Sequence, residues 1–294
     1  IYSSIKNAID ITRNLNAQII YVDDKSKDDS YRKLKKKANN KNDILILRSK
    51  KNLGPGNARN IGLKKAQGKK IIFLDIEDRL VVSNLKEMLE IYRKKSLNLI
   101  NYNHIVLNKN IKKKVFVSKL ISSSNRRNLI DFLIKKTEKS VIYTMFEKKF
   151  ISRNKIFFNN GYHEDIFFIY RCLFYNKKKI KFFKKIVYKK YNHSFSITNT
   201  FSLNHLKGMF LAWKNIYFFL KQKLSVNEYR KFNFYIQYRL RGEFVNEFNK
   251  ILSLSKNHND KKRNLKFLIL NYKKIIDLKF NIKTRKDKIA DLLL

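Results

Sequence analysis

The stretch NLGPGNARNIGLKKAQGKKIIFLDIED, residues 52–78, carries the pattern that decides the fold. Two glycines flank a proline at 54–56, which predicts a tight loop that opens a helix. We expect this helix over 56–67, with Gly68 as its C-terminal stop. An apolar strand is then expected over 70–75. A loop, a helix and a buried strand in this order are typical of a sheet covered by helices.

Three carboxylates, Asp75, Glu77 and Asp78, lie at the end of that strand. Extended geometry would point Asp75 and Glu77 to the same side of the chain. Paired oxygen ligands of this kind suit magnesium or manganese bound together with substrate phosphates. A solvated loop is the alternative.

Arg59 lies in the first turn of the helix that follows the glycine loop. A helix N-terminus favours anions, so a cation there needs a partner. Either a nucleotide phosphate or one of two carboxylates, Asp24 and Asp75, could supply it. The loop is not a P-loop, because the GKS or GKT ending is missing.

The elements on either side of this stretch alternate in the same way. Earlier in the chain we expect helices over 1–15 and 30–38 and strands over 18–24 and 43–48. Later we expect helices over 84–94, 128–136 and 164–175, extended segments within 96–120 and strands within 180–191. The fold class is therefore α/β, a mostly parallel sheet flanked by helices, which binds ligands at the carboxyl ends of its strands.

Strand signals stop after residue 198. Lys-rich and aromatic-rich helical patterns follow over 203–223, 226–252 and 261–278. We therefore expect a domain over 1–198 and a basic, α-helical C-terminal region over 199–294. This region could pack on the first domain, mediate self-association or bind an anionic membrane surface.

The run YVDDKSKDDS, residues 21–30, places two adjacent carboxylates, Asp23 and Asp24, at a strand end. Like charges repel each other and resist burial, so packing alone is a poor reason for the pair. The two could bind a base or ribose, or help to hold a metal. The alternative is a polar turn whose last residues cap the next helix.

In this order, YVDDKSKDDS, NLGPGNARNIGLKKAQG and IIFLDIEDRL resemble glycosyltransferase family 2. The usual forms in that family are a VDDGSxD turn, an NxGxxxARNxG helix start and an FLDxDD strand end. The resemblance covers residues 1–198 and implies a Rossmann-like fold of the GT-A type. It also implies that the chain begins after the first strand of the family, which helps to hold the nucleotide base.

Two later segments fit the same resemblance. GYHEDIFFIYRCLFY, from Gly161, is similar to the acidic pair that opens a helix in the family, which implies that Asp165 is the general base. Without that resemblance, acids favoured by the helix dipole would explain the pair. YNHSFSIT, residues 191–198, is similar to a segment near the donor phosphates, which implies that His193 binds the donor; a surface histidine is the alternative.

The resemblance implies the remaining roles at the donor site. Asp23 or Asp24 would contact the uridine of a UDP-sugar, Arg59 would help to hold the nucleotide, and Asp75 and Glu77 would hold a divalent manganese or magnesium ion. This sequence departs from the family pattern at Lys25, where Gly is usual, and at Glu77, where Asp is usual. A catalytically degenerate member that acts as a scaffold is therefore an alternative.

The chain has 294 residues and a net charge of +44. Attraction to phosphate is one reading of this charge, and a Lys-rich composition spread over every solvated face is the other. The single cysteine, Cys172, excludes an internal disulfide. A nucleic-acid-binding protein is disfavoured because the acids cluster at strand ends and no known nucleic-acid motif is visible.

The function implied by the resemblance is transfer of a sugar, with inversion, from a nucleotide-sugar to a hydroxyl of a glycan or lipid-linked acceptor. Bacterial surface polysaccharide or lipooligosaccharide synthesis is the expected setting. No stretch reaches the roughly 18 apolar residues of a membrane span. The lone cysteine favours a reducing compartment, and the basic charge would be attracted to an anionic membrane. We expect a cytoplasmic protein, peripheral on the inner face of the plasma membrane.

Overall fold

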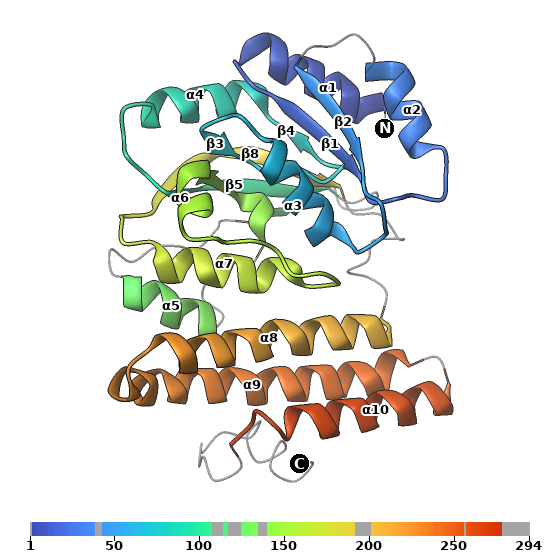
Figure 1. Cartoon of the computed structure of the whole chain (residues 1–294), viewed down its shortest axis with the longest axis vertical. Helices are drawn as coiled ribbons and strands as arrows, with labels where there is room; N and C mark the ends of the chain where they lie inside the picture. Colours follow the sequence, from blue (N-terminus) through green and yellow to red (C-terminus); the bar gives the residue numbers. More distant parts are fainter. Residues whose placement is uncertain are drawn as a thin grey trace.

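The structure is a computed structural model that describes residues 2–38, 43–107, 114–116, 125–134, 140–191, 201–255 and 257–277. An α/β region forms the upper part of the molecule, and three long helices form a layer beneath it (Figure 1). The predicted donor ligand His193 and parts of the 96–120 segment lie outside the described residues.

The first ten elements are α1 (Tyr2–Asn14), β1 (Ile19–Asp23), α2 (Ser30–Ala38), β2 (Ile44–Arg48), α3 (Pro55–Lys65), β3 (Lys70–Ile71), β4 (Arg79–Leu80), α4 (Val82–Tyr92), β5 (Leu99–Leu107) and β6 (Lys114–Phe116). The first six elements alternate between helix and strand as expected, whereas β4 directly follows β3 and was not predicted, and β6 directly follows β5. The strand predicted over 70–75 is wrong in length, since only its first two residues pair with a neighbouring strand.

Most of the helical residues lie in the later elements. They are α5 (Asn125–Leu133), a short 3₁₀ helix (Val141–Tyr143), β7 (Thr144–Glu147), α6 (Lys148–Arg153), α7 (Glu164–Tyr175), β8 (Lys181–Tyr191), α8 (Leu203–Lys223), α9 (Val226–Leu254) and α10 (His258–Tyr272). The helices expected after residue 200 are confirmed, with α10 shorter at its C-terminal end than the prediction.

Each of the three C-terminal helices begins at a capping side chain. Ser202 accepts a hydrogen bond from a backbone amide of α8, and Ser225 and Asn257 do the same for α9 and α10. In α9 the cap is followed three residues later by Glu228, the arrangement of a capping box. These caps satisfy amides that have no partner within the helix and so fix where each helix starts.

The described strands form two sheets. β1 and β2 pair in parallel, and a six-stranded sheet has the order β3-β7-β5-β8-β4, with β6 paired to β5. The α/β class is confirmed, but the prediction of a mostly parallel sheet needs correction. In the larger sheet only β5 and β8 are parallel, and the other four pairings are antiparallel. An apolar run indicates that a strand is buried, but it does not indicate whether the strand that pairs with it runs parallel or antiparallel.

One continuous hydrophobic core joins the α/β region to the C-terminal helices. Phe158 and Phe168 stack with ring centroids 3.9 Å apart, and Phe73 meets both rings edge-on. Below them Trp213 of α8 is fully buried and lies beside Phe132 of α5. The boundary predicted near residue 199 falls within the undescribed segment 192–200, and the core extends across it.

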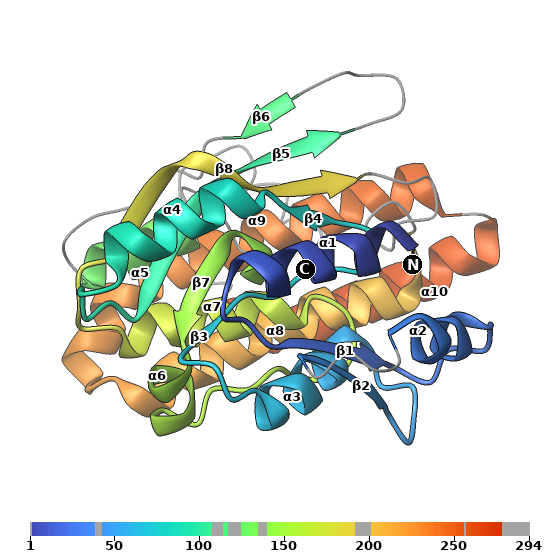
Figure 2. The same cartoon turned by 90° about the horizontal axis from the view of Figure 1, so that it is seen from above.

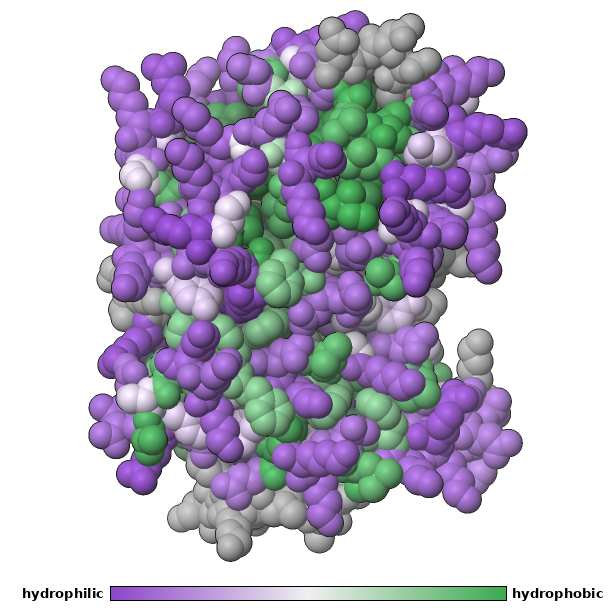
Figure 3. Space-filling view, viewed as in Figure 1, coloured by the Kyte–Doolittle hydropathy of each residue, from purple (hydrophilic) through white to green (hydrophobic). Residues whose placement is uncertain are grey.

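Seen from above (Figure 2), α1 and α4 lie in front of the larger sheet and α8 to α10 lie behind it. The face seen in Figure 3 is mainly hydrophilic and has a broad apolar area over β1 and β2. Most residues of these two strands are only partly buried. Within the described residues, no helix has the length and apolar character needed to cross a bilayer.

Candidate functional site

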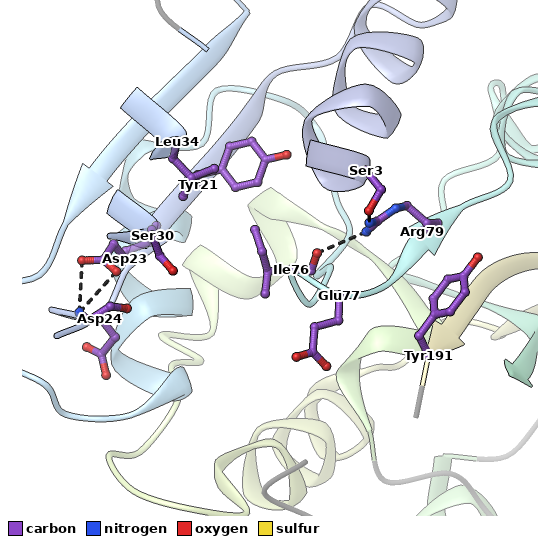
Figure 4. A pocket seen from close by; sticks show the side chains of 12 residues that line it. Ser3, Tyr21, Asp23, Asp24, Ser30, Leu34, Ile76, Glu77, Arg79 and Tyr191 are labelled. Atoms are coloured by element: carbon purple, nitrogen blue, oxygen red, sulfur yellow. Dashed lines mark hydrogen bonds between the residues drawn. The ribbon is translucent and has the colours of Figure 1, made fainter. Parts of the chain in front are cut away.

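A pocket of about 700 Å³ opens at the carboxyl end of β1. This volume is in the range of small-molecule binding sites. Asp23 and Asp24 lie on one side, and Glu77, Arg79 and Tyr191 lie on the other (Figure 4). The pocket is lined by Ser3, Tyr21, Val22, Asp23, Asp24, Ser26, Ser30, Leu34, Ile76, Glu77, Arg79 and Tyr191.

The two adjacent carboxylates at the carboxyl end of β1 have different partners. Asp23 is buried, accepts hydrogen bonds from the Ser26 amide and forms an ion pair with Nε of Arg48 at 3.0 Å. Asp24 accepts the Gly54 amide at 2.6 Å and a bond from Nδ2 of Asn57 at 3.3 Å. Asp24 therefore anchors the loop that opens α3, which explains why two carboxylates stand side by side here.

Arg59 links two distant carboxylates. One guanidinium nitrogen contacts Oδ1 of Asp75 at 3.0 Å, and the other contacts Oε1 of Glu164. Burial opposes the charge of Arg59, but Asp75, Glu164 and Asp165 together outweigh it and hold the pKa of the guanidinium above its ordinary value. Of the partners considered from the sequence, the carboxylate Asp75 is the one observed. Glu164 was not foreseen as a partner.

Asp165 is the second residue of α7, directly after the ion-paired Glu164. Burial raises the pKa of Asp165, while Arg59 and a hydrogen bond with Ser140 lower it and the charge of Asp75 raises it further. Burial also raises the pKa of Glu164, with Arg59 opposing and Asp165 adding to the increase. A carboxylate with a raised pKa is a stronger proton acceptor than an exposed one.

Residues 75–78 form a turn and not an extended strand end, since the Asp78 amide donates to the Asp75 carbonyl oxygen at 3.0 Å. The expectation that extended geometry aligns Asp75 with Glu77 is therefore wrong. The third acid, Asp78, is buried and accepts bonds from the Tyr188 hydroxyl at 2.5 Å and the Tyr191 amide at 2.8 Å. Asp78 thus joins this turn to β8.

The two predicted metal ligands offer oxygen atoms on an accessible surface. Asp75 has 48% of its side chain exposed, and Glu77 is exposed and lines the pocket. Within the described residues, no group of three or more potential ligands comes together. Two carboxylates still fit a magnesium or manganese ion that takes its other ligands from a diphosphate and water.

The sequence did not single out several residues that the structure brings to the pocket. Arg79 directly follows the acidic cluster, and its guanidinium donates to the Ile76 carbonyl at 3.1 Å and contacts the Ser3 hydroxyl. Its position next to three acidic residues in the sequence could have indicated that Arg79 belongs to the site. Tyr191 reaches the pocket from the end of β8, and its position depends on strand pairing that no local pattern reveals.

Comparison with known proteins identifies the family of this chain. Residues 1–181 match the family described as Glycosyl transferase family 2. An uncharacterized glycosyltransferase of Haemophilus influenzae is 28% identical over 219 residues, which cover 72% of this chain and 79% of the relative. A cholesterol galactosyltransferase of Borreliella burgdorferi is 26% identical over 270 residues, covering 87% and 73%.

Solved structures share the fold at low sequence identity. The crystal structure of S. aureus TarS 1-349 in complex with UDP-GlcNAc aligns with a TM-score of 0.64 and 17% identity, covering 98% of this chain and 85% of that one. The UDP complex of the same protein aligns with a TM-score of 0.61 and 16% identity over the same shares. With the match over residues 1–181, this chain belongs to glycosyl transferase family 2.

Proposed function

We propose that the protein transfers a hexosyl or N-acetylhexosaminyl group from a UDP-sugar to an acceptor hydroxyl, with inversion at the anomeric carbon. The observation that carries this proposal is the double contact of Arg59 with Asp75 and Glu164. It joins the acidic turn beside the pocket to the start of α7, where Asp165 lies. A donor-side acid and a basic carboxylate are thereby held in one site.

The donor fits the pocket at the end of β1. Solved structures of similar fold include TarS complexes with UDP-GlcNAc and with UDP. Asp23 or Asp24 contacts the uridine, because a carboxylate retains lone pairs after accepting one or two bonds. On the opposite wall Arg79 supplies a positive charge toward the diphosphate. In this arrangement Arg59 supports the nucleotide site by holding the carboxylates.

The transfer is a single displacement. The acceptor hydroxyl gives its proton to the carboxylate of Asp165 as its oxygen forms a bond to the anomeric carbon. The bond between that carbon and the diphosphate oxygen breaks, and UDP leaves with the electron pair. One displacement needs one base, so no carboxylate nucleophile is required, in contrast to retaining glycosidases. The raised pKa of Asp165 makes the carboxylate a more effective base.

Asp75 and Glu77 hold a divalent manganese or magnesium ion in this proposal. Bound there, the ion would stabilise negative charge on the departing diphosphate as a Lewis acid. The oxygen donors and their exposure fit an ion shared with a substrate. The ion pair with Arg59 holds the Asp75 side chain in place beside the pocket.

The acceptor is a glycan or a lipid-linked glycan of a bacterial surface polysaccharide or lipooligosaccharide, made at the cytoplasmic face of the membrane. A relative described as a cholesterol galactosyltransferase supports an acceptor in a membrane. On α8 the exposed apolar residues Leu211 and Phe218 alternate with exposed lysines 207, 214 and 221. Such a stripe would be attracted to anionic lipid. We expect the protein to float with anionic liposomes at low salt and to be released at high salt. Absence of such salt-sensitive binding would count against membrane association.

A screen of UDP-sugars tests the proposal. We expect UDP release from at least one UDP-hexose or UDP-N-acetylhexosamine when manganese and a lipid or glycan extract are present. Asp165→Asn should abolish that release and retain UDP binding. An Asp165→Asn variant with near-normal turnover would refute the assignment of the base. Failure of the wild-type protein to bind UDP with or without manganese would favour a non-catalytic scaffold.

A further inference from the structure

The loop before α7, residues 159–163, is held on one side by the start of α3. The Gly161 amide donates to the Leu53 carbonyl oxygen at 3.2 Å. A Cβ atom added to Gly56 would collide with the Asn159 carbonyl oxygen and lie 2.9 Å from Cγ of Glu164. The start of α3 and this loop therefore touch backbone to backbone, and the loop cannot move further toward α3.

Helix α8, in the C-terminal part of the chain, packs against the same loop. A Cβ atom added to Gly208 would lie 2.5 Å from the Tyr162 carbonyl oxygen and 2.9 Å from its carbonyl carbon. Real Cβ atoms essentially never come this close to a backbone. Gly is a poor helix former, and Gly208 lies well inside a 21-residue helix. The contact with Tyr162 is the physical reason for a residue without a side chain here.

A pair of histidines forms the second contact between α8 and the loop. Nε2 of His163 lies 3.1 Å from Nε2 of His205, with the rings nearly perpendicular. Burial, then the charges of His205 and Lys250, lower the pKa of His163 to about 3, against the opposing effect of Glu243. Burial lowers the pKa of His205 as well. Both rings are neutral near pH 7, so one nitrogen donates and the other accepts.

His163 also has a backbone conformation that few side chains adopt. Its φ is 59°, in the left-handed region, and it is the last residue before α7 begins at Glu164. A non-glycine residue in this region is uncommon and persists only where its surroundings hold it. The contact with His205 is one such restraint, and it acts two residues before Asp165.

We propose that α8 is a positioning element for the base. Gly208 and His205 hold Tyr162 and His163, and the loop in turn fixes where α7 begins and where Asp165 lies. This inference rests on the proposed function, because it takes Asp165 as the base. It gives the helical region after residue 200 a part in catalysis. A displacement of a reacting group by about 1 Å can lower turnover by roughly 100-fold.

The test compares two Gly→Ala substitutions in long helices. A Cβ atom on Gly242 of α9 would meet nothing within 4 Å among the described residues, so Gly242→Ala is the matched control. We expect Gly208→Ala to lower kcat by about 10-fold or more, with KM for the donor and Kd for UDP within about twofold of wild type. Turnover is measured as UDP released from the donor found in the screen.

Equal turnover in Gly208→Ala and Gly242→Ala would overturn the proposal. A parallel loss of UDP binding in Gly208→Ala would also overturn it, since that would indicate collapse of the whole site. Amide hydrogen exchange over residues 159–166 gives a readout that needs no substrate. We expect faster exchange there in Gly208→Ala than in the control, and unchanged exchange would contradict the account.

A second pair of variants covers the case in which Gly208→Ala does not fold. His205→Ala removes the ring contact with His163, and His205→Gln returns an amide near the position of Nε2. We expect His205→Ala to lower kcat without a change in Kd for UDP, and His205→Gln to recover part of it. Wild-type turnover in His205→Ala, or no difference between the two variants, would overturn the proposal.

Asp165→Asn, assayed in parallel, separates this inference from the proposed function. If Asp165→Asn retains turnover, the assigned base is wrong and the positioning proposal fails with it. If Asp165→Asn is inactive while Gly208→Ala and His205→Ala turn over normally, the base stands and only the role of α8 is refuted.

Discussion

Arg59 and Glu164 form a mostly buried ion pair across 105 residues of sequence, joining the fifth residue of α3 to the first residue of α7. The same guanidinium also contacts Asp75. The guanidinium of Arg59 thus interacts electrostatically with three carboxylates, those of Asp75, Glu164 and Asp165. The candidate site is organised around this arginine.

Removal of Arg59 should destabilise the protein as well as inactivate it. The side chains of Arg59 and Glu164 are 16% and 7% exposed, so Arg59→Ala leaves a buried carboxylate without its cation. Breaking a buried pair costs about 3–5 kcal/mol, and we expect a decrease of that order in the free energy of unfolding in urea. Arg126→Ala is the control.

Arg126 pairs with Glu228 on the surface, with side chains 66% and 36% exposed. Exposed pairs contribute less than about 1 kcal/mol, so the Arg126→Ala variant should unfold close to wild type. Similar decreases in the free energy of unfolding in the two variants would show that the buried ion pair of Arg59 does not stabilise the protein.

Asp165→Asn should separate binding from chemistry. The substitution keeps the shape of the side chain but removes the proton acceptor, so turnover should fall by at least about 100-fold. UDP binding, measured by calorimetry, should stay within about twofold because Asp165 does not line the pocket at β1. Asp10→Asn, on the exposed face of α1, is the control and should behave as wild type.

As the pH is lowered, activity should be lost at a higher pH than the ordinary pKa of an aspartate would give. Burial raises the pKa of Asp165, and a base must be ionised to accept a proton, so kcat/KM should rise with pH through this raised value. The hydrogen bond with Ser140 lowers the same pKa. Ser140→Ala should therefore move the acidic limb of the pH profile to higher pH. A shift to lower pH, or no shift, would contradict the assignment.

Tyr188 should be important for stability although it is not expected to touch substrate. Its hydroxyl donates to the buried carboxylate of Asp78, which is left with the Tyr191 amide in Tyr188→Phe. An unsatisfied buried polar group costs about 1–3 kcal/mol, which urea unfolding can measure. Tyr92→Phe removes only a long bond of 3.4 Å to Phe182 and serves as the control. Equal stability of the two variants would contradict this role.

Local sequence patterns predicted the elements with strong periodicity. The bounds of α2 and α7 agree with the expected 30–38 and 164–175, because apolar spacing and terminal acids or lysines mark both ends. The carboxylates at the ends of β1 and the 70–75 segment were also identified. Three of them, Asp23, Asp24 and Glu77, line one pocket in the structure.

Long-range geometry could not be predicted from the same patterns. The contact of Arg59 with Glu164 and that of His163 with His205 join residues 105 and 42 positions apart, and no periodicity encodes such a pairing. The antiparallel strand β7 depends on pairing with β3 and β5, and the turn at Asp75–Asp78 is held to β8 by the bonds from Tyr188 and Tyr191 to Asp78. The role of Asp24 as a holder of the Gly54 amide was hidden for the same reason.

The central claim is that Asp75 and Glu77 hold a divalent ion with the diphosphate of a UDP-sugar. Titration of UDP into the protein with manganese, and again with EDTA, tests this claim most directly, with Asp75→Ala as the paired variant. We expect binding that requires manganese in the wild type and is lost in Asp75→Ala. UDP binding of equal strength with manganese and with EDTA, and unchanged in Asp75→Ala, would contradict the account.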